Sequence, residues 1–225
     1  MQLSKSIVPL LTLLGKIHTA NMGITERKER QRKEVRESIL QSAWQIVNEE
    51  GWQTLSIRKI ADAIEYSVPV VYDHFENKEA ILFEFNKMGF KLLSDKLKET
   101  IEQHKKPTAQ LEAIAYAYWD FAFQNKEYYQ VMFGLGMPGC EQIKKMPEIM
   151  DFTEIIKTTI EAIFKENGNK DGNSFLKLNA FWSMLHGLVS INLMTQLAPS
   201  GADRQELNKM ILTDFIKGFI KSLEG

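Results

Sequence analysis

The chain has 225 residues, which is long enough for one or two domains with a buried core. Its apolar fraction of 44%, charged fraction of 25% and formal net charge of −1 are typical of a folded globular protein and exclude a mainly disordered one. The single cysteine, Cys140, excludes a disulfide scaffold and predicts a cytoplasmic protein. The balanced charge gives no overall sign of nucleic-acid binding, so any contact with DNA must come from a local feature.

Residues 1–25 are predicted to form an N-terminal extension. Residues 7–14 imitate the apolar centre of a secretory signal, but they are too short to cross a bilayer, and no clear cleavage site follows them. Met22 opens a natural start, so we expect residues 1–21 to be dispensable. A short helix packed on the body and a genuine targeting segment are the two alternatives.

The first predicted helix starts at residue 26. Residues 27–36 hold six basic and two acidic side chains, a run typical of a solvated helix face. Apolar residues then recur at helical spacing from Val35 to Val47. Gly51 is predicted to end this helix as its C-terminal cap.

Two very short helices follow. Ser56 is placed to cap a helix over 57–64, and Ser67 to cap a second over 68–75. Asn77 is expected to cap the helix that comes next. Such short helices do not persist alone, so their buttressing by a long helix on each side predicts a helix-turn-helix over 56–75, within a DNA-binding domain over 26–77.

Residues 39–82 contain the ordered series Gly51, Ser56, Ile60, Ala61, Ser67, Tyr72, His74, Phe75, Lys78 and Glu79. With this series the segment resembles the DNA-binding domain of TetR-type transcriptional regulators. The chain differs from the family pattern in two places: Glu65 stands where a turn glycine is usual, and the recognition helix opens with Val68, Pro69 and Val70.

The resemblance implies a role for eight residues on DNA. Those expected to contact the phosphate backbone are Ser56, Arg58, Tyr72, His74 and Lys78, and those expected to contact bases are Val68, Pro69 and Val70. The apolar opening points to contacts such as those with thymine methyl groups. A core tyrosine and a structural histidine remain the alternatives for Tyr72 and His74. Residues 26–80 carry nine basic and eleven acidic side chains, so phosphate contacts must come from a few placed groups.

The remaining residues, 78–225, are predicted to form a larger helical regulatory and dimerisation domain, which makes the chain all-α. No strand pattern or fixed repeat is found. The expected helices cover residues 78–103, 109–125, 127–135, 149–166, 174–196 and 203–223.

The segment 174–196 is apolar on all sides, so it must be buried on all sides. Polar residues such as Lys177 and His186 argue against a membrane span. We expect one face in the domain core and the other against a second subunit, where the last helix completes a four-helix bundle across a twofold axis. The predicted apolar stripe of the last helix is Leu207, Ile211, Phe215, Phe219 and Leu223. The predicted residues of the dimer interface are Phe181, Leu185, Leu188, Phe215 and Phe219.

An effector pocket is predicted among the middle helices, with plain core packing as the alternative. The residues are Tyr116, Trp119, Phe123, Met132, Phe133, Met150, Phe152, Met184 and His186. None is cationic, so the predicted ligand is a small, neutral or cationic, largely hydrophobic effector held near Trp119 and Met184. Trp182, His186 and Gly187 also resemble the Trp-His-Gly signature of one C-terminal domain class of TetR-type regulators.

We find no motif for catalysis and none for a metal or cofactor. The four histidines are dispersed, and Ser56 and Lys59 match a nucleophile motif without its companion motifs. The leading hypothesis is therefore a homodimeric DNA-binding regulator, a repressor released from its operator by a small molecule, with no enzymatic activity. The alternative is a helical dimeric ligand-binding or interaction protein without specific DNA binding.

Overall fold

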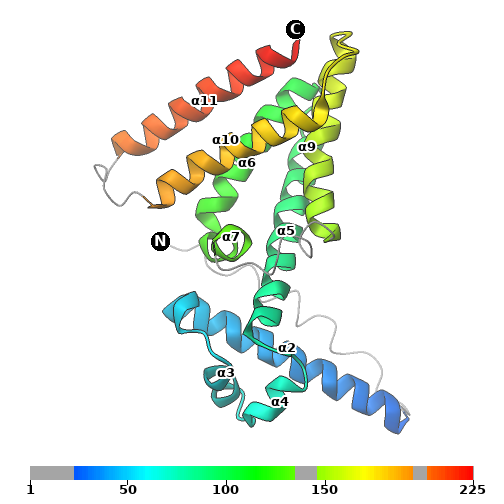
Figure 1. The fold of residues 1–225 in the computed structure, drawn as a ribbon, viewed down its shortest axis with the longest axis vertical. Coiled ribbons are helices and arrows are strands. Elements are labelled where there is room, and N and C mark those ends of the chain that lie inside the picture. Colours follow the sequence, from blue (N-terminus) through cyan, green and yellow to red (C-terminus); the bar gives the residue numbers. More distant parts are fainter. Residues whose placement is uncertain (1–22, 135–145, 195–201, 225) are drawn as a thin grey trace.

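The computed structural model describes residues 23–134, 146–194 and 202–224, without the side chains of 194 and 202–205. Every regular element in these ranges is a helix, which confirms the all-α fold (Figure 1). None of these helices is long and apolar enough to cross a membrane. The predictions for residues 1–22, including the start at Met22, lie outside the described residues.

The N-terminal part is a helix-turn-helix unit. It consists of α2 (Ile24–Glu50), η1 (Trp52–Thr54), α3 (Ile57–Ala63) and α4 (Val68–Tyr72). Helix α2 buries its C-terminal half through Ile39, Ala43 and Val47, as its apolar spacing predicts. It ends at Gly51, whose φ of 83° lies in a region that favours glycine.

Two of the three predicted caps are confirmed. The Ser56 hydroxyl accepts a hydrogen bond from the Lys59 amide at 3.2 Å, and the Asn77 side chain accepts one from the Ala80 amide at 2.8 Å. Ser67 occupies the predicted N-cap position of α4, although its side chain makes no capping hydrogen bond. Helix α4 is also shorter than expected, because it gives way to a turn after Tyr72.

The turn between α3 and α4 closes on a left-handed residue. The Tyr66 amide bonds to the Ala61 carbonyl at 3.0 Å and the Glu65 amide to the Asp62 carbonyl at 3.3 Å, which is the Schellman pattern. This pattern requires a positive φ at Glu65, and the observed value is 58°. A side chain in that region costs roughly 1–2 kcal/mol, which explains why glycine is usual there in the family that the sequence resembles.

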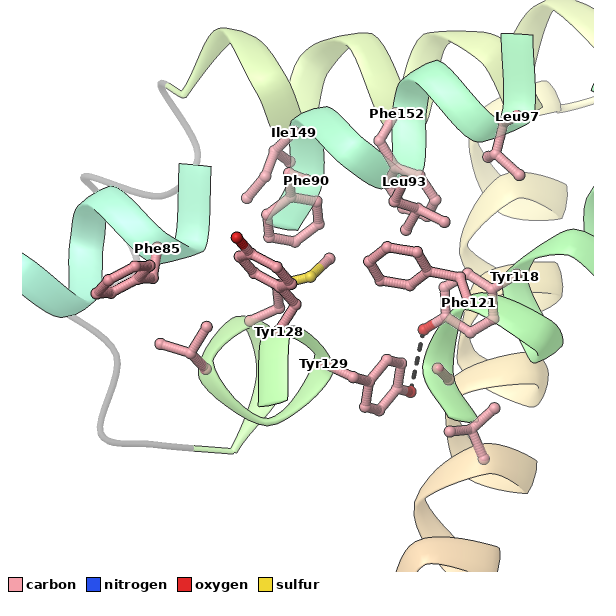
Figure 2. Close-up of a cluster of buried hydrophobic side chains, with 14 of the residues drawn as sticks. Phe85, Phe90, Leu93, Leu97, Tyr118, Phe121, Tyr128, Tyr129, Ile149 and Phe152 are labelled. Atoms are coloured by element: carbon pink, nitrogen blue, oxygen red, sulfur yellow. Dashed lines mark hydrogen bonds between the residues drawn. The ribbon is translucent and has the colours of Figure 1, made fainter. Parts of the chain in front are cut away.

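The regulatory domain is a bundle built on one long helix. Helix α5 (Lys78–Glu102) rises from the helix-turn-helix unit and packs against α6 (Pro107–Gln124), α7 (Lys126–Phe133) and α9 (Pro147–Glu166). Helices α10 (Ser174–Met194) and α11 (Ala202–Glu224) lie side by side at the end of the molecule remote from α4 (Figure 1). The bundle core includes Phe90, Leu93, Tyr118, Phe121 and Phe152 (Figure 2).

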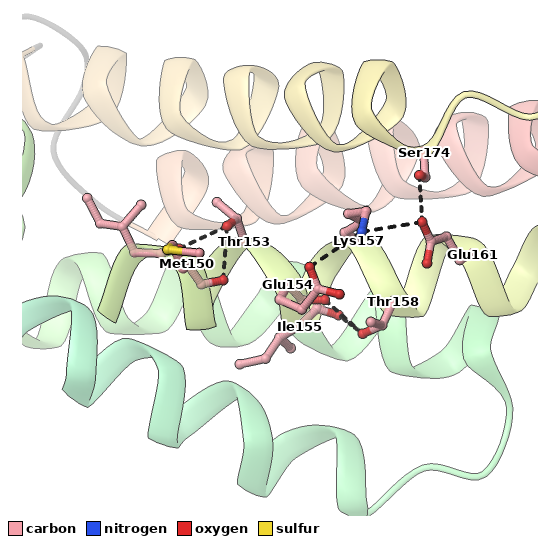
Figure 3. Close-up of polar contacts among 9 residues, drawn as sticks. Met150, Thr153, Glu154, Ile155, Lys157, Thr158, Glu161 and Ser174 are labelled. Atoms are coloured by element: carbon pink, nitrogen blue, oxygen red, sulfur yellow. Dashed lines mark hydrogen bonds and ion pairs between the residues drawn. The ribbon is translucent and has the colours of Figure 1, made fainter. Parts of the chain in front are cut away.

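Helix α9 shows how the amphipathic pattern orients the bundle. Its apolar face includes Phe152, which is fully buried, whereas the face in Figure 3 carries polar contacts. There Lys157 lies 3.5 Å from Glu154 and 3.6 Å from Glu161, and the Ser174 hydroxyl donates to Glu161 at 2.7 Å. Exposed ion pairs stabilise little. The bond to Ser174 ties the start of α10 to α9.

Helix α7 joins the two parts of the molecule. The Trp52 indole donates to the Glu127 carbonyl at 2.9 Å, and the Trp44 ring stacks on Tyr128 with centroids 4.1 Å apart. On the other side, a Cβ at Gly89 of α5 would lie 2.6 Å from the Met132 sulfur, so this close approach needs glycine. Helix α7 is therefore held between the helix-turn-helix unit and α5.

Candidate nucleic-acid interface and regulatory core

Helix α4 presents an outward face of apolar groups and one phenol. Pro69 is exposed, and Val68 and Val70 are half-buried. Val71 points inward and is fully buried, which fixes the rotation of the helix. The Tyr72 side chain is 51% exposed, so it is not the core tyrosine of the alternative interpretation. The face carries no cation of its own.

The remaining predicted phosphate contacts lie around α4 in different states. Arg58 is exposed in the first turn of α3, and Ser56 uses its hydroxyl as the helix cap. The Lys78 ammonium lies 3.5 Å from the Trp52 carbonyl, within the protein. His74 is half-buried, and its pKa is lowered by burial and by the nearby Arg32 guanidinium. The His74 imidazole is therefore neutral at pH 7.

Two arginines of α2 hold the end of α4. Arg32 donates to the Asp73 carbonyl at 3.4 Å, and Arg36 donates to the His74 carbonyl at 3.2 Å while its guanidinium lies 4.1 Å above the Phe75 ring. Carbonyl groups at a helix C-terminus carry partial negative charge and attract cations. From the sequence alone, the basic run over residues 27–36 is predicted to be a solvated helix face. The spacing of four residues between the two arginines is the signal that could have found them.

A hydrogen-bonded chain crosses the regulatory core from α6 through α7 to α10. The Tyr118 and Tyr129 hydroxyls lie 3.1 Å apart, and the Tyr129 hydroxyl lies 2.6 Å from Nδ1 of His186 (Figure 2 shows the first contact). Nε2 of His186 lies 3.3 Å from the Ser190 hydroxyl. All groups are satisfied when Tyr118 donates to Tyr129, Tyr129 donates to neutral His186, and His186 donates to Ser190. The network assigns this tautomer.

The pKa values of Tyr118, Tyr129 and His186 keep these hydrogen-bonded side chains neutral at pH 7. Burial lowers the pKa of His186 below its ordinary 6.5 and raises the pKa of Tyr129 to about 12. Burial also raises the pKa of Tyr118 well above its usual range. Next to the hydrogen-bonded residues, the buried Trp182 indole N–H makes no hydrogen bond of good geometry within the described residues, and only a weaker interaction with the Tyr118 hydroxyl opposes the rise of that pKa. The cluster therefore holds one weakly bonded donor.

The predicted pocket residues do not converge on one place. Phe133, Phe152, Trp182 and His186 form an aromatic cluster, in which the Phe133 and His186 rings are 4.8 Å apart. Four of the predicted residues lie in or beside it: Met132, Phe133, Phe152 and His186. Trp119 and Phe123 pair with each other at 4.6 Å, and the Tyr116 hydroxyl bonds to Thr213 of α11 at 2.7 Å. Met150 and Met184 are 58% and 53% exposed.

Among the predicted site residues, only His74 lines either of two hollows on the surface of the described residues. One hollow lies along α11 and the other between α2 and the end of α4. Their linings are Glu206, Lys209, Met210, Thr213, Asp214 and Lys217 for the first, and Glu29, Arg32, Lys33, Arg36 and His74 for the second.

The structure corrects the predicted dimer interface. Phe181 and Leu185 are buried within a single chain, and Phe219 packs on Phe181 with ring centroids 5.1 Å apart. Leu188 and Phe215 are half-buried. The predicted α11 stripe also splits, because α11 has two apolar faces: Leu212, Ile216, Phe219 and Leu223 face the core, whereas Leu207 and Ile211 are exposed. The exposed apolar residues of these two helices are Phe175, Leu176, Met184, Ile191, Leu207, Met210 and Ile211.

The all-helical fold and the outward-facing α4 define a helix-turn-helix protein of the class of DNA-binding transcriptional regulators. Residues 39–85 match the family described as bacterial regulatory proteins of the tetR family. Residues 111–215 match the C-terminal domain described as tetracyclin repressor-like. The chain thus carries the N-terminal and C-terminal domains of the TetR family, which is one of transcriptional regulators rather than enzymes. Within the described ranges, no group of three or more His, Cys, Asp or Glu residues is placed to hold a metal ion.

Individual relatives support the same assignment. The uncharacterised HTH-type transcriptional regulator YobS of Bacillus subtilis is 29% identical over 92 residues, which cover 41% of this chain and about half (48%) of that relative's length. A solved structure of a Rhodococcus protein of unknown function has a TM-score of 0.68 at 20% identity, covering 85% of this chain and 96% of that chain. The regulator FadR of Bacillus subtilis, solved with stearoyl-CoA, has a TM-score of 0.62 at 15% identity, covering 84% and 97%. These likenesses in structure show the shared fold.

Acidification should destabilise the protein through His186. A protonated imidazole cannot accept from Tyr129, so Tyr129 would have to donate to Tyr118 and leave the Tyr118 proton without an acceptor. Because the folded-state pKa lies below 6.5, the unfolded chain binds more protons as the pH falls below that value. Stability is therefore fully present above pH 6.5 and decreases below it.

The measurement is the free energy of unfolding by urea between pH 5 and 8. His186→Gln should weaken the dependence of this free energy on pH. His104→Gln changes a histidine outside the hydrogen-bonded network and serves as the control. An unchanged pH profile in His186→Gln would contradict the assigned network.

Proposed function

We propose that the chain is a homodimeric repressor that binds a near-palindromic operator through α4 and is released by a small molecule. It would act on DNA in the cytoplasm. The observation that carries the proposal is the exposed α4, held in a fixed orientation by the α3–α4 turn and by the two arginines of α2. Two such helices related by a twofold axis fit successive major grooves.

Base recognition would rest mainly on apolar contacts. Pro69, Val68 and Val70 offer methyl and methylene groups to the groove floor, where thymine presents its C5 methyl. The Tyr72 hydroxyl would bond to a phosphate and fix the register of the helix without reading sequence.

Dimerisation would occur through α10 and α11. Their outer faces expose Met184 and Ile211 at 53% and 43%. Added Cβ atoms at Gly187 of α10 and Gly218 of α11 would meet nothing within 4 Å, so these glycines serve no packing within one chain. A helix-interior glycine costs up to about 1 kcal/mol, and close approach of a second copy would account for both.

The effector would bind beside the hydrogen-bonded chain of the regulatory core. Trp182 supplies a weakly bonded donor, and Tyr129 and His186 supply polar anchors. None of the three is cationic at pH 7, because burial lowers the pKa of His186. This chemistry favours a neutral or cationic hydrophobic ligand that carries a hydrogen-bond acceptor. The solved FadR of Bacillus subtilis holds stearoyl-CoA, an anionic ligand, which is the competing possibility. Trp182, His186 and Gly187 also support placing this domain in the Trp-His-Gly class.

Selection from a random pool of duplex DNA tests the proposed function directly. We expect recovery of near-palindromes with half-sites about one helical turn apart. Tyr72→Phe should weaken binding at least about a hundredfold on every duplex, because each protomer of the dimer loses a hydrogen bond to a charged phosphate. Tyr66→Phe, in the turn before α4, is the matched control. Recovery of no sequence would favour the alternative, a ligand-binding or interaction protein without specific DNA binding.

Met184→Glu should convert the dimer into monomers. Met184 is exposed in one chain, so the substitution leaves the protomer fold intact, but twofold symmetry places two unpaired carboxylates in the dimer contact. We expect the dissociation constant to rise by at least about a hundredfold. Met88→Glu is the same change at a methionine of α5 that is 37% exposed. Sedimentation of both variants decides the result, and an intact Met184→Glu dimer would place the interface elsewhere.

Neutral lipophilic compounds should stabilise the protein thermally and release it from its operator. Trp182→Phe keeps an aromatic ring and removes the weakly bonded donor, so it should reduce the response to ligands that carry an acceptor. Trp119→Phe is the control outside the aromatic cluster. Stearoyl-CoA belongs in the same screen, and a response confined to such strongly anionic ligands would refute the proposed effector class.

A further inference from the structure

The positive charge of the DNA-binding domain is concentrated in one segment. Residues 24–36 carry six basic and three acidic side chains, a net charge of +3. Residues 37–80, which include α3, the turn and α4, carry three basic and eight acidic side chains, a net charge of −5. The part that should read the bases therefore repels the phosphate backbone, and attraction must come from the start of α2.

The start of α2, residues 24–31, projects from the protein as an exposed helical arm. Residues 23–34 are all exposed, so they bury no apolar surface and add nothing to the core. Eight residues, 24–31, precede Arg32, and they extend the helix by about 12 Å beyond that contact, close to the width of a major groove. In Figure 1 the arm descends to the level of α4, at the end of the molecule opposite α10 and α11.

The arm is also fixed in its orientation toward α4. Arg32 and Arg36 bond to the carbonyls of Asp73 and His74 at the end of α4, so the two helices move together. Lys28 continues the same stripe, one helical turn before Arg32. Within the described residues, neither Arg27 nor Lys28 makes an ion pair, whereas Arg30 and Lys33 pair loosely with Glu34 and Glu37 at 3.6 and 3.8 Å.

We propose that the arm, residues 24–31, contacts the DNA backbone outside the half-site that α4 reads, with Arg27 and Lys28 as its principal phosphate-binding residues. The arm is basic and its single large apolar residue is Ile24, which suits a polyanion rather than a membrane or an apolar protein surface. The inference rests on the proposed function, because the arm needs a docked α4 to be placed on DNA.

The consequence is an operator longer than its readable sequence. Flanking base pairs would add affinity whatever their sequence, since phosphates are the same everywhere along the duplex. The contribution would also depend steeply on salt. Each phosphate contact changes the slope of log affinity against log salt concentration by about 0.9, so the loss of two contacts from each protomer, four from the dimer, should reduce that slope by about 3.6.

The test compares Arg27→Gln/Lys28→Gln with Lys96→Gln/Lys105→Gln, which removes the same charge from exposed positions of the regulatory domain. The probe is the duplex recovered by selection, either trimmed at the outer edges of its half-sites or extended by about ten base pairs on each side. Binding is measured between 50 and 200 mM salt, on the intact dimeric protein, and circular dichroism confirms that both variants fold.

On the extended duplex, the arm variant should bind more weakly than wild type, and the ratio of their affinities should change about a hundredfold across this salt range. On the trimmed duplex, the arm variant and the control should bind alike. An arm variant that equals the control on both duplexes overturns the inference while leaving the proposed function intact. A wild-type protein that selects no sequence overturns both.

Discussion

The contact of α7 with Trp44 and Trp52 is the interaction on which the rest of the architecture depends. A stacked ring pair and one hydrogen bond join the helix-turn-helix unit to a helix whose other residues reach into the regulatory core. Tyr128 packs on Trp44, and the adjacent Tyr129 bonds to His186 of α10. Neighbouring residues of one short helix thus face the DNA-binding unit and the outermost helix pair. Because packed cores deform little, a displacement of α7 must also displace residues in the helix-turn-helix unit and in α10.

The two halves stabilise their polar groups in opposite ways. In the regulatory core, burial keeps Tyr118, Tyr129 and His186 neutral, and the order of donors and acceptors fixes their arrangement. Around α4, charged guanidinium groups at the surface hold backbone carbonyls. The core is therefore sensitive to protonation and to hydrogen-bonding ligands, whereas the DNA-binding face is sensitive to ionic strength.

Local signals in the sequence predicted most of the fold. Caps such as Ser56 and Asn77 act through residues three positions away, so their effect could be inferred from the chain itself. The failure at the α10–α11 pair has a different origin. Both helices are apolar on more than one side, and periodicity alone cannot decide which side meets the chain's own core, so Phe181 was expected at an interface and lies inside. Arg32 and Arg36 bond to α4 across about forty residues of sequence. Their four-residue spacing shows that they share one helix face, but it does not show what that face contacts.

The left-handed Glu65 has a consequence for how this regulator could change over generations. Glutamate and glycine codons differ only at their second base, so a relaxed α3–α4 turn is a single nucleotide substitution away. Natural proteins are rarely at their stability optimum, and a reserve of about 1 kcal/mol is a meaningful share of the total for a small unit. The turn thus gives this lineage a nearby compensating mutation, able to offset a destabilising change elsewhere, including one in α4 that alters which operators it recognises.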